Sequence, residues 1–101
     1  MTEIPRNDAI PVTTTSTELL QDAVGRGGRK IFVFRNNSPN AIDIITLSFG
    51  TRAAIAGSGV ILRQNDQYGE ANGEGFKSWQ GAIQAICATA NGSISVMERE
   101  E

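Results

Sequence analysis

The sequence has no histidine and only one cysteine, Cys87, among its 101 residues. Histidine is the commonest general base at neutral pH and the commonest transition-metal ligand, so its absence argues against an enzyme. A single cysteine cannot form an internal disulfide, a zinc cluster or a Cys–His dyad. We therefore expect a protein that is not an enzyme, with no catalytic residues, no cofactor and no bound metal.

The sequence also lacks an excess of positive charge and any long apolar run. Nine Lys and Arg residues stand against eleven Asp and Glu residues, giving a net charge of −2, so no basic field favours nucleic acid. Apolar runs such as residues 31–34 are far shorter than the roughly 20 residues that span a bilayer. No basic region followed by an apolar stretch opens the chain, so we expect no signal peptide and assembly in a cytoplasm.

What the sequence does contain is the composition of one small folded domain. Apolar residues make up 40% of the chain and charged residues 20%. At this length the hydrophobic core is thin, and such domains often gain stability by pairing with copies of themselves or with a larger partner. We expect a loose arm over residues 1–8, a single domain over 9–98 and a charged tail over 99–101.

Short runs rich in β-branched residues predict an all-β domain. They number six to eight and lie at near-regular spacing without a convincing long helix, which is typical of a small antiparallel β-sandwich or jelly-roll-like barrel. Residues 30–35 form the strongest strand, and because their apolar side chains do not alternate with polar ones, we expect both faces of this strand to be covered. The predicted strands lie at about residues 9–17, 30–35, 41–49, 60–62, 82–89 and 93–97.

Two turn signals predict hairpins. The cluster at residues 36–40 would join the strand at 30–35 to the strand at 41–49, which also shows a phase switch near Ile44 indicating a β-bulge or a strand that bends between two sheets. Asn91 and Gly92 would form a type I′ turn between the last two strands. Residues 63–75 are polar and glycine-rich, which predicts a long loop or a meander of short edge strands.

This polar segment holds the residues that could bind a ligand. Asp66, Glu70 and Glu74 could supply oxygen ligands to Ca²⁺, but their spacing does not match an EF-hand and no second cluster supports them, which favours a solvated loop. The aromatic residues that flank the segment, Tyr68, Phe76 and Trp79, could form a sugar-stacking platform or an anchor in a protein interface, and Trp79 could equally be a lid on the core.

Four segments follow one another in an order that resembles the small head-decoration, or cement, proteins of tailed bacteriophages. These segments are RKIFVFRNNS at residues 29–38, GVIL at 59–62, WQGAIQAI at 79–86 and ISVME at 94–98. The resemblance spans about residues 10–98. It departs from the pattern where the usual Leu-x-Pro-Gly turn is replaced by residues 62–65, which read LRQN.

The resemblance implies a non-enzymatic virion protein that binds the major capsid protein on the assembled capsid and stabilises it. It further implies a homo-oligomer, with a trimer favoured. From the net charge and the short apolar runs we expect no nucleic-acid partner and no membrane partner. The candidate contact residues lie in the arm, in the loop at 52–58 and in the segment at 63–79: Ile4, Arg6, Ile10, Arg52, Arg63, Tyr68, Phe76 and Trp79.

A second hypothesis is a carbohydrate- or receptor-binding module of a phage fibre or baseplate. In that case Trp79, Tyr68 and the acidic loop would form the ligand site.

Overall fold

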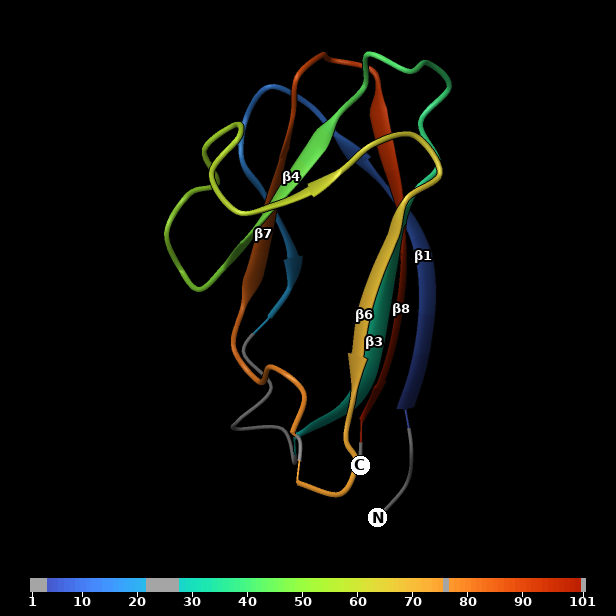
Figure 1. The fold of residues 1–101 in the computed structure, drawn as a ribbon, viewed down its shortest axis with the longest axis vertical. Helices are drawn as coiled ribbons and strands as arrows, with labels where there is room; N and C mark the ends of the chain where they lie inside the picture. Colours follow the sequence, from blue (N-terminus) through green and yellow to red (C-terminus); the bar gives the residue numbers. More distant parts are fainter. Residues whose placement is uncertain (1–3, 22–27, 76, 101) are drawn as a thin grey trace.

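A computed structural model describes residues 4–21, 28–75 and 77–100 of the chain. Within them the chain forms eight strands in two antiparallel sheets that pack face to face, as Figure 1 shows. The all-β antiparallel sandwich predicted from the sequence is confirmed. The strands are β1 (Ile4–Val12), β2 (Thr17–Leu20), β3 (Arg29–Asn36), β4 (Ile45–Phe49), β5 (Val60–Leu62), β6 (Gln67–Ala71), β7 (Ile83–Cys87) and β8 (Gly92–Glu100).

The first sheet has the strand order β1-β8-β3-β6 and the second the order β2-β7-β4-β5; we call them sheet A and sheet B. The chain changes sheet at every connection except the one from β4 to β5. Both described ends of the chain lie at the same end of the sandwich, because β1 runs antiparallel to β8 with Ile4 opposite Glu100. No helix within the described residues is long and apolar enough to cross a membrane.

The core lies between the two sheets. The residues that alternate inward along β3 and β8, Phe32, Phe34, Ile94 and Val96, are buried. They face the inward residues of sheet B, and the whole set forms one cluster: Val12, Leu19, Leu20, Phe32, Phe34, Ile45, Leu47, Leu62, Ile83, Ala85, Cys87, Ile94 and Val96. Burial of these side chains supplies the main driving force for folding, about 1.5–3 kcal/mol for each large aliphatic or aromatic one.

Several predicted boundaries differ from the structure. The first strand, expected at 9–17, is β1 and already begins at Ile4, so residues 4–8 are strand rather than arm, and Thr17 belongs to β2. Residues 99 and 100, expected in a tail, complete β8. In both cases a polar segment whose composition does not indicate a strand becomes one, because β1 and β8 pair with each other there.

Both predicted hairpins are wrong. β3 pairs with β6 and β8, whereas β4 pairs with β5 and β7 in the other sheet, so the segment between β3 and β4 crosses the sandwich. The same is true of β7 and β8, which flank Asn91. The turn residues do reverse the chain direction, but a reversal can place the next strand in the facing sheet as well as beside the first strand.

Gly92 shows why the second turn signal is misleading. The backbone angle φ of Gly92 is not positive, so this residue does not occupy the left-handed position of a type I′ turn. A Cβ built on Gly92 would lie 2.5 Å from the carbonyl oxygen of Val12 and 2.7 Å from Sγ of Cys87. Glycine is required here by the close approach of β1 and β7, not by its backbone conformation.

We therefore expect Gly92→Ala to lower the free energy of unfolding by about 1–3 kcal/mol, because the added methyl group must displace packed atoms. Gly73→Ala is the matched control, since a Cβ there has no neighbour within 4 Å. Chemical denaturation of both variants measures the difference, and equal stability of the two would contradict this role for Gly92.

Candidate functional site

No described segment of the chain crosses the outer face of sheet A. In the antiparallel ladder Val33 lies opposite Met97 of β8 and Gly69 of β6, and Ile31 lies opposite Ala71. Successive side chains of a strand point to opposite faces of the sheet. These residues alternate with the buried ones, so they point away from the core. Ile31, Val33 and Met97 are half-buried, while Gly69 and Ala71 are exposed.

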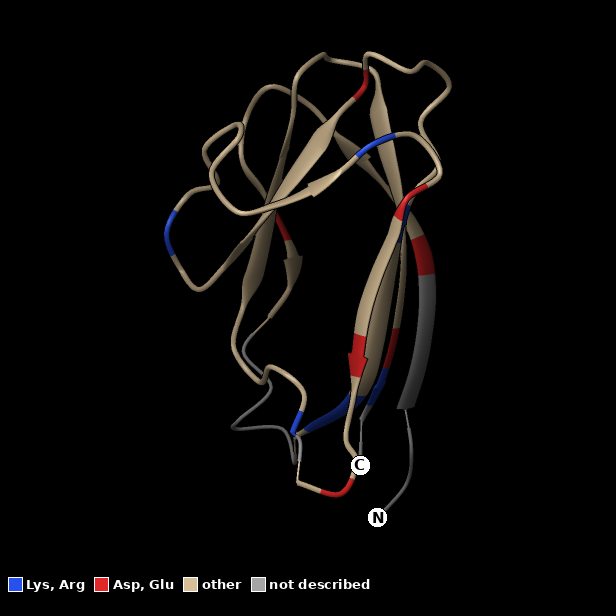
Figure 2. Ribbon diagram, viewed as in Figure 1, with Lys and Arg blue, Asp and Glu red and all other residues tan. Residues whose placement is uncertain are grey.

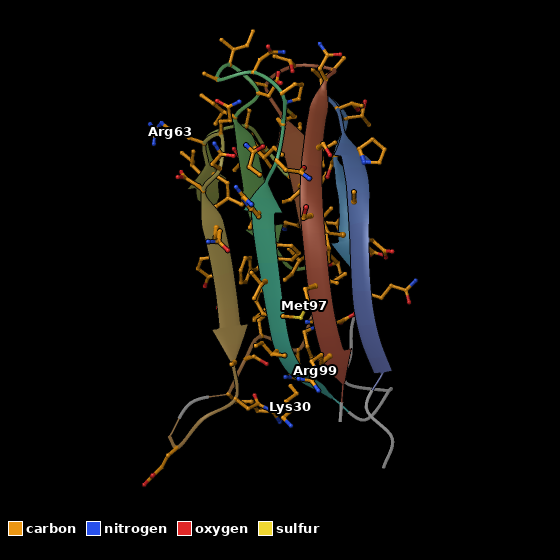
Figure 3. All side chains as sticks on the ribbon, turned by 90° about the vertical axis from the view of Figure 1, so that its right-hand side faces the viewer. Lys30, Arg63, Met97 and Arg99 are labelled. Carbon is orange, nitrogen blue, oxygen red and sulfur yellow. The ribbon has the colours of Figure 1, made fainter. Side chains whose placement is uncertain are left out.

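This face carries two shallow hollows. One of ≈ 370 Å³ is lined by Asp8, Ala9, Val33, Arg35, Ser95, Val96 and Met97. The other, of ≈ 240 Å³, is lined by Ile31, Val33, Gly69, Glu70 and Ala71. Figure 3 views this face: Met97 lies near its middle, whereas Lys30 and Arg99 lie at the end that holds the chain termini. The face is thus apolar at its centre and charged toward its margins.

Sheet B differs, because its own loop covers it. The segment between β4 and β5 folds over the outer face, where the backbone N–H of Gly57 donates to Oγ1 of Thr46 at 3.1 Å. The N–H of Ala54 donates to Oγ of Ser16 at 2.8 Å. Thr46, which points outward, is consequently only 3% exposed. Figure 1 shows this loop lying against sheet B, while no comparable segment lies on the outer face of sheet A.

The expectation that both faces of the strand at 30–35 are covered is therefore met on one side only. Phe32 and Phe34 lie in the core, but nothing in the described chain covers Ile31 and Val33. This outer face was not among the predicted contact residues. The signal that could have found it was the unbroken apolar run in β3.

A buried ion pair fixes the end of the sandwich next to this face. Arg29, the first residue of β3, is fully buried, and its Nε donates to Oε2 of Glu98 on β8 at 2.7 Å. The guanidinium also donates to the backbone carbonyl oxygens of Gln21, Trp79 and Gly81 at 2.6–3.0 Å. The charge of Arg29 is thereby fully engaged by the protein and is not offered to a ligand.

Trp79 lies in the connection from β6 to β7 and partly covers the open side of the core. Its ring centroid is 5.7 Å from that of Phe49, and its Nε1 donates to the carbonyl oxygen of Ala82 at 3.0 Å. The ring remains 38% exposed. These contacts are those of a core lid, with one edge of the indole left accessible.

Tyr68, the second aromatic residue predicted to bind a partner, is held by the same group of residues. Its ring centroid lies 5.8 Å from that of Phe49, and its hydroxyl donates to Oε2 of Glu70. The other oxygen of Glu70 accepts the backbone N–H of Trp79 at 2.8 Å. This hydrogen bond, together with burial and the negative charge of Glu70, raises the pKa of Tyr68 to about 12.

Among the predicted contact residues whose side chains the structure describes, only Tyr68 and Trp79 come together. Ile10 packs against the core, Arg52 is exposed on the loop that covers sheet B, and Arg63 is exposed between β5 and β6. Ile4 and Arg6 belong to β1, opposite Glu100 and Glu98 in the ladder. Phe76 lies outside the described residues.

The carboxylates considered for Ca²⁺ have separate partners. Asp66 accepts the backbone N–H of Arg63, Glu70 binds Tyr68 and Trp79, and Glu74 is exposed. Within the described part of the chain no three His, Cys, Asp or Glu side chains are grouped so that they could hold a metal ion.

Comparison with known proteins gives a likeness in fold. No family model and no curated protein matches the chain. Among solved structures, a chain of the Bacillus endospore appendages, described as a family of disulfide-linked pili, superposes with a TM-score of 0.56 at 9% sequence identity. The superposition covers 98% of this chain and 86% of that one. At this identity the comparison concerns the fold alone.

The buried ion pair leads to a first prediction for this region. Arg29→Met should lower the free energy of unfolding by about 3–5 kcal/mol, because it removes the buried guanidinium that binds the carboxylate of Glu98. Arg35→Met on the same strand is the control, since Arg35 is exposed, and it should change stability by less than about 0.5 kcal/mol. Urea denaturation decides between these outcomes, and similar losses in both variants would contradict the role of the pair.

The single tyrosine of the chain allows a second prediction. Tyr68 should ionise with a midpoint of about 12, which an ultraviolet absorbance titration at alkaline pH measures. Glu70→Gln should move this midpoint toward the ordinary value of 10.0. Because the pKa is raised in the folded state, any stabilisation from the protonated hydroxyl is complete below pH 10 and is lost as the pH rises toward 12. An unchanged midpoint in the Gln variant would show that Glu70 is not the cause.

Proposed function

We propose that this chain is a non-enzymatic structural protein that binds a larger protein assembly through the outer face of sheet A. The observation that carries the proposal is the mismatch in β3, whose sequence is typical of a strand covered on both faces although the chain itself covers one. Ile31, Val33 and Met97 form an apolar centre on that face, and charged residues surround it. Such an arrangement, with an apolar centre and a polar rim, is typical of protein interfaces.

The assembly that we propose is the capsid of a tailed bacteriophage, with the chain as a head-decoration protein that contacts the major capsid protein. The support for this step is the order of the segments at 29–38, 59–62, 79–86 and 94–98. We also assign the sandwich to the jelly-roll type, on the basis of its strand orders β1-β8-β3-β6 and β2-β7-β4-β5. A modest interface repeated over many lattice sites stabilises a shell through multivalency.

The likeness to the endospore appendage chain supports the more general part of the proposal, that the fold serves assembly. That protein forms disulfide-linked pili. Disulfide linkage does not extend to this chain in any simple way, because Cys87 is buried in β7 against Gly92. Here non-covalent contacts would have to hold the subunits.

The alternative, a carbohydrate- or receptor-binding module, would use the exposed edge of Trp79 together with Tyr68. We favour assembly because the polar atoms of both side chains already bind Ala82 and Glu70 within the protein. A glycan array separates the two functions: binding that Trp79→Ala abolishes would favour the module and count against the structural role.

The structural role predicts that Val33→Asp weakens binding to purified capsids at least about tenfold in a co-sedimentation assay, because it places a charge at the apolar centre of the interface. Ile61→Asp is the matched control. Ile61 is 41% exposed on the opposite sheet, and its replacement should leave binding unchanged.

Two results would contradict the proposal. One is a wild-type protein that does not sediment with capsids at all. The other is an equal loss of binding in both variants, which would place the contact elsewhere.

A further inference from the structure

The two edges of sheet A differ in what they offer to another strand. In an antiparallel ladder the N–H and C=O of one residue point to the same side, and those of the next residue point to the other side. The backbone N–H of Asn36 donates to Asp66 at 3.0 Å, and the N–H of Asn72 donates to the carbonyl of Lys30 at 2.8 Å. Even-numbered residues of β3 therefore bond toward β6.

It follows which residues of β6 face outward. Phe34 is opposite Tyr68 and Phe32 is opposite Glu70, so Tyr68 and Glu70 exchange the ladder bonds with β3. The residues between and beside them, Gln67, Gly69 and Ala71, direct their N–H and C=O groups to the free edge. Among the described residues none binds these groups.

The other edge, β1, is blocked. Ser93 accepts from Asn37 and donates to Ser38, so odd-numbered residues of β8 face β3 and even-numbered ones face β1. The even-numbered residues of β1 are their partners, and the odd-numbered ones face the free edge. These include Pro5 and Pro11, which have no N–H to donate and are a common protection of edge strands.

The edge of β6 has no such protection. Gln67, Gly69 and Ala71 are uncharged, none is a proline, and all are exposed. The edges of sheet B are shorter, with three residues in β5 and four in β2, which also contains a register shift. Gly69, at the middle of β6, has no side chain; a Cβ there would lie 2.6 Å from the carbonyl oxygen of Phe32, so the close approach of β3 requires this glycine. An exposed, uncharged edge without proline is a template for another strand.

We propose that β6 pairs antiparallel with β6 of a second copy of this chain, with Gly69 opposite Gly69 on a two-fold axis. In this register Gln67 of each copy lies opposite Ala71 of the other, and these three pairs are the hydrogen-bonded ones. On the inner side, Tyr68 lies opposite Glu70. No like charges face each other, so the strand is complementary to itself.

The flanking charges agree with the antiparallel direction. Exposed Arg63 and Asp66 precede β6, and exposed Glu74 and Lys77 follow it. The two-fold axis brings Arg63 of one copy toward Glu74 of the other, whereas Asp66 lies opposite the uncharged Asn72. Figure 3 shows Arg63 near the start of β6, and Figure 2 shows acidic residues at the end of β6 and in the loop after it. A parallel pairing would instead place Arg63 beside Arg63 and Glu74 beside Glu74.

The pairing goes beyond the proposed function and deepens it. It would join two copies of sheet A into one continuous sheet and set their outer faces side by side. A dimer would then contact a lattice through two such faces at once, which strengthens attachment without any new contact. It also predicts pairs of subunits, whereas the phage resemblance implies trimers.

The first test measures mass in solution by light scattering over a range of concentrations. The wild-type chain should have about twice its 10.8 kDa mass, and Ala71→Pro should be a monomer because it removes an N–H from the free edge of β6. Ala9→Pro is the matched control: it is an exposed alanine whose N–H faces the free edge of β1, and its replacement should leave the dimer intact.

A second test fixes the register and does not depend on proline. Gln67→Lys combined with Ala71→Lys should dissociate the dimer, since each lysine would lie opposite another. Gln67→Lys combined with Ala71→Glu should retain it, because each lysine would then lie opposite a glutamate. Near-ultraviolet circular dichroism of Trp79 confirms that each variant is folded.

Any of four results overturns the pairing: a wild-type monomer throughout, a wild-type trimer, dissociation by Ala9→Pro but not by Ala71→Pro, or equal behaviour of the two double variants. Capsid binding is measured separately, so failure of the dimer and failure of the proposed function are distinguishable.

Discussion

The burial of one guanidinium, that of Arg29, organises the end of the sandwich where the chain termini lie. A buried cation is tolerated only when its donors are satisfied and an anion lies beside it. Glu98 supplies the anion from the neighbouring strand, and the carbonyls of Gln21, Trp79 and Gly81 come from the two connections that cross between the sheets at this end. Strands β3 and β8 and the two crossing segments are therefore held at one guanidinium, and each of them can move away only by leaving a buried N–H group of Arg29 without its acceptor.

The same strand ends in a second buried polar residue. Asn36 donates from its side chain to the carbonyls of Asp43 and Leu62, both at 2.9 Å, and its Oδ1 accepts the N–H of Ser38 at 3.0 Å. These contacts tie β3 to the segment that crosses to β4 and to the end of β5. β3 is thus fixed at both ends by polar groups that a strand paired with β4 could not satisfy in the same way. No buried side-chain nitrogen or oxygen of the described residues lacks a partner, so this polar framework is complete.

The sequence was sufficient to locate most of the strands and insufficient for their pairing. β-branched and apolar runs marked β3, β4, β5, β7 and β8, because those residues suit a pleated, buried surface wherever the strand lies. Pairing depends on contacts far apart in the chain, such as that of Arg29 with Glu98, which no local turn signal contains. The candidate site shows the same limit. Tyr68 and Trp79 were identified as aromatic residues beside a loop, but their shared packing on Phe49 depends on β4 and β6 meeting across the core.

The prediction that both faces of β3 are covered is met on one face only, and this difference bears on function. An apolar run that is buried on both sides would normally belong to a strand between two layers. Here one layer is sheet B, and no described segment of the chain supplies the other, although the connection from β4 to β5 provides such a layer for sheet B. The same sheet has one edge carrying Pro5 and Pro11 and another edge without protection. In a protein selected only to remain monomeric, we would expect both edges of the sheet to be protected and its outer face to be polar. The difference between the two edges, and between the two outer faces, supports the proposed role as a subunit whose open surfaces are covered by neighbours.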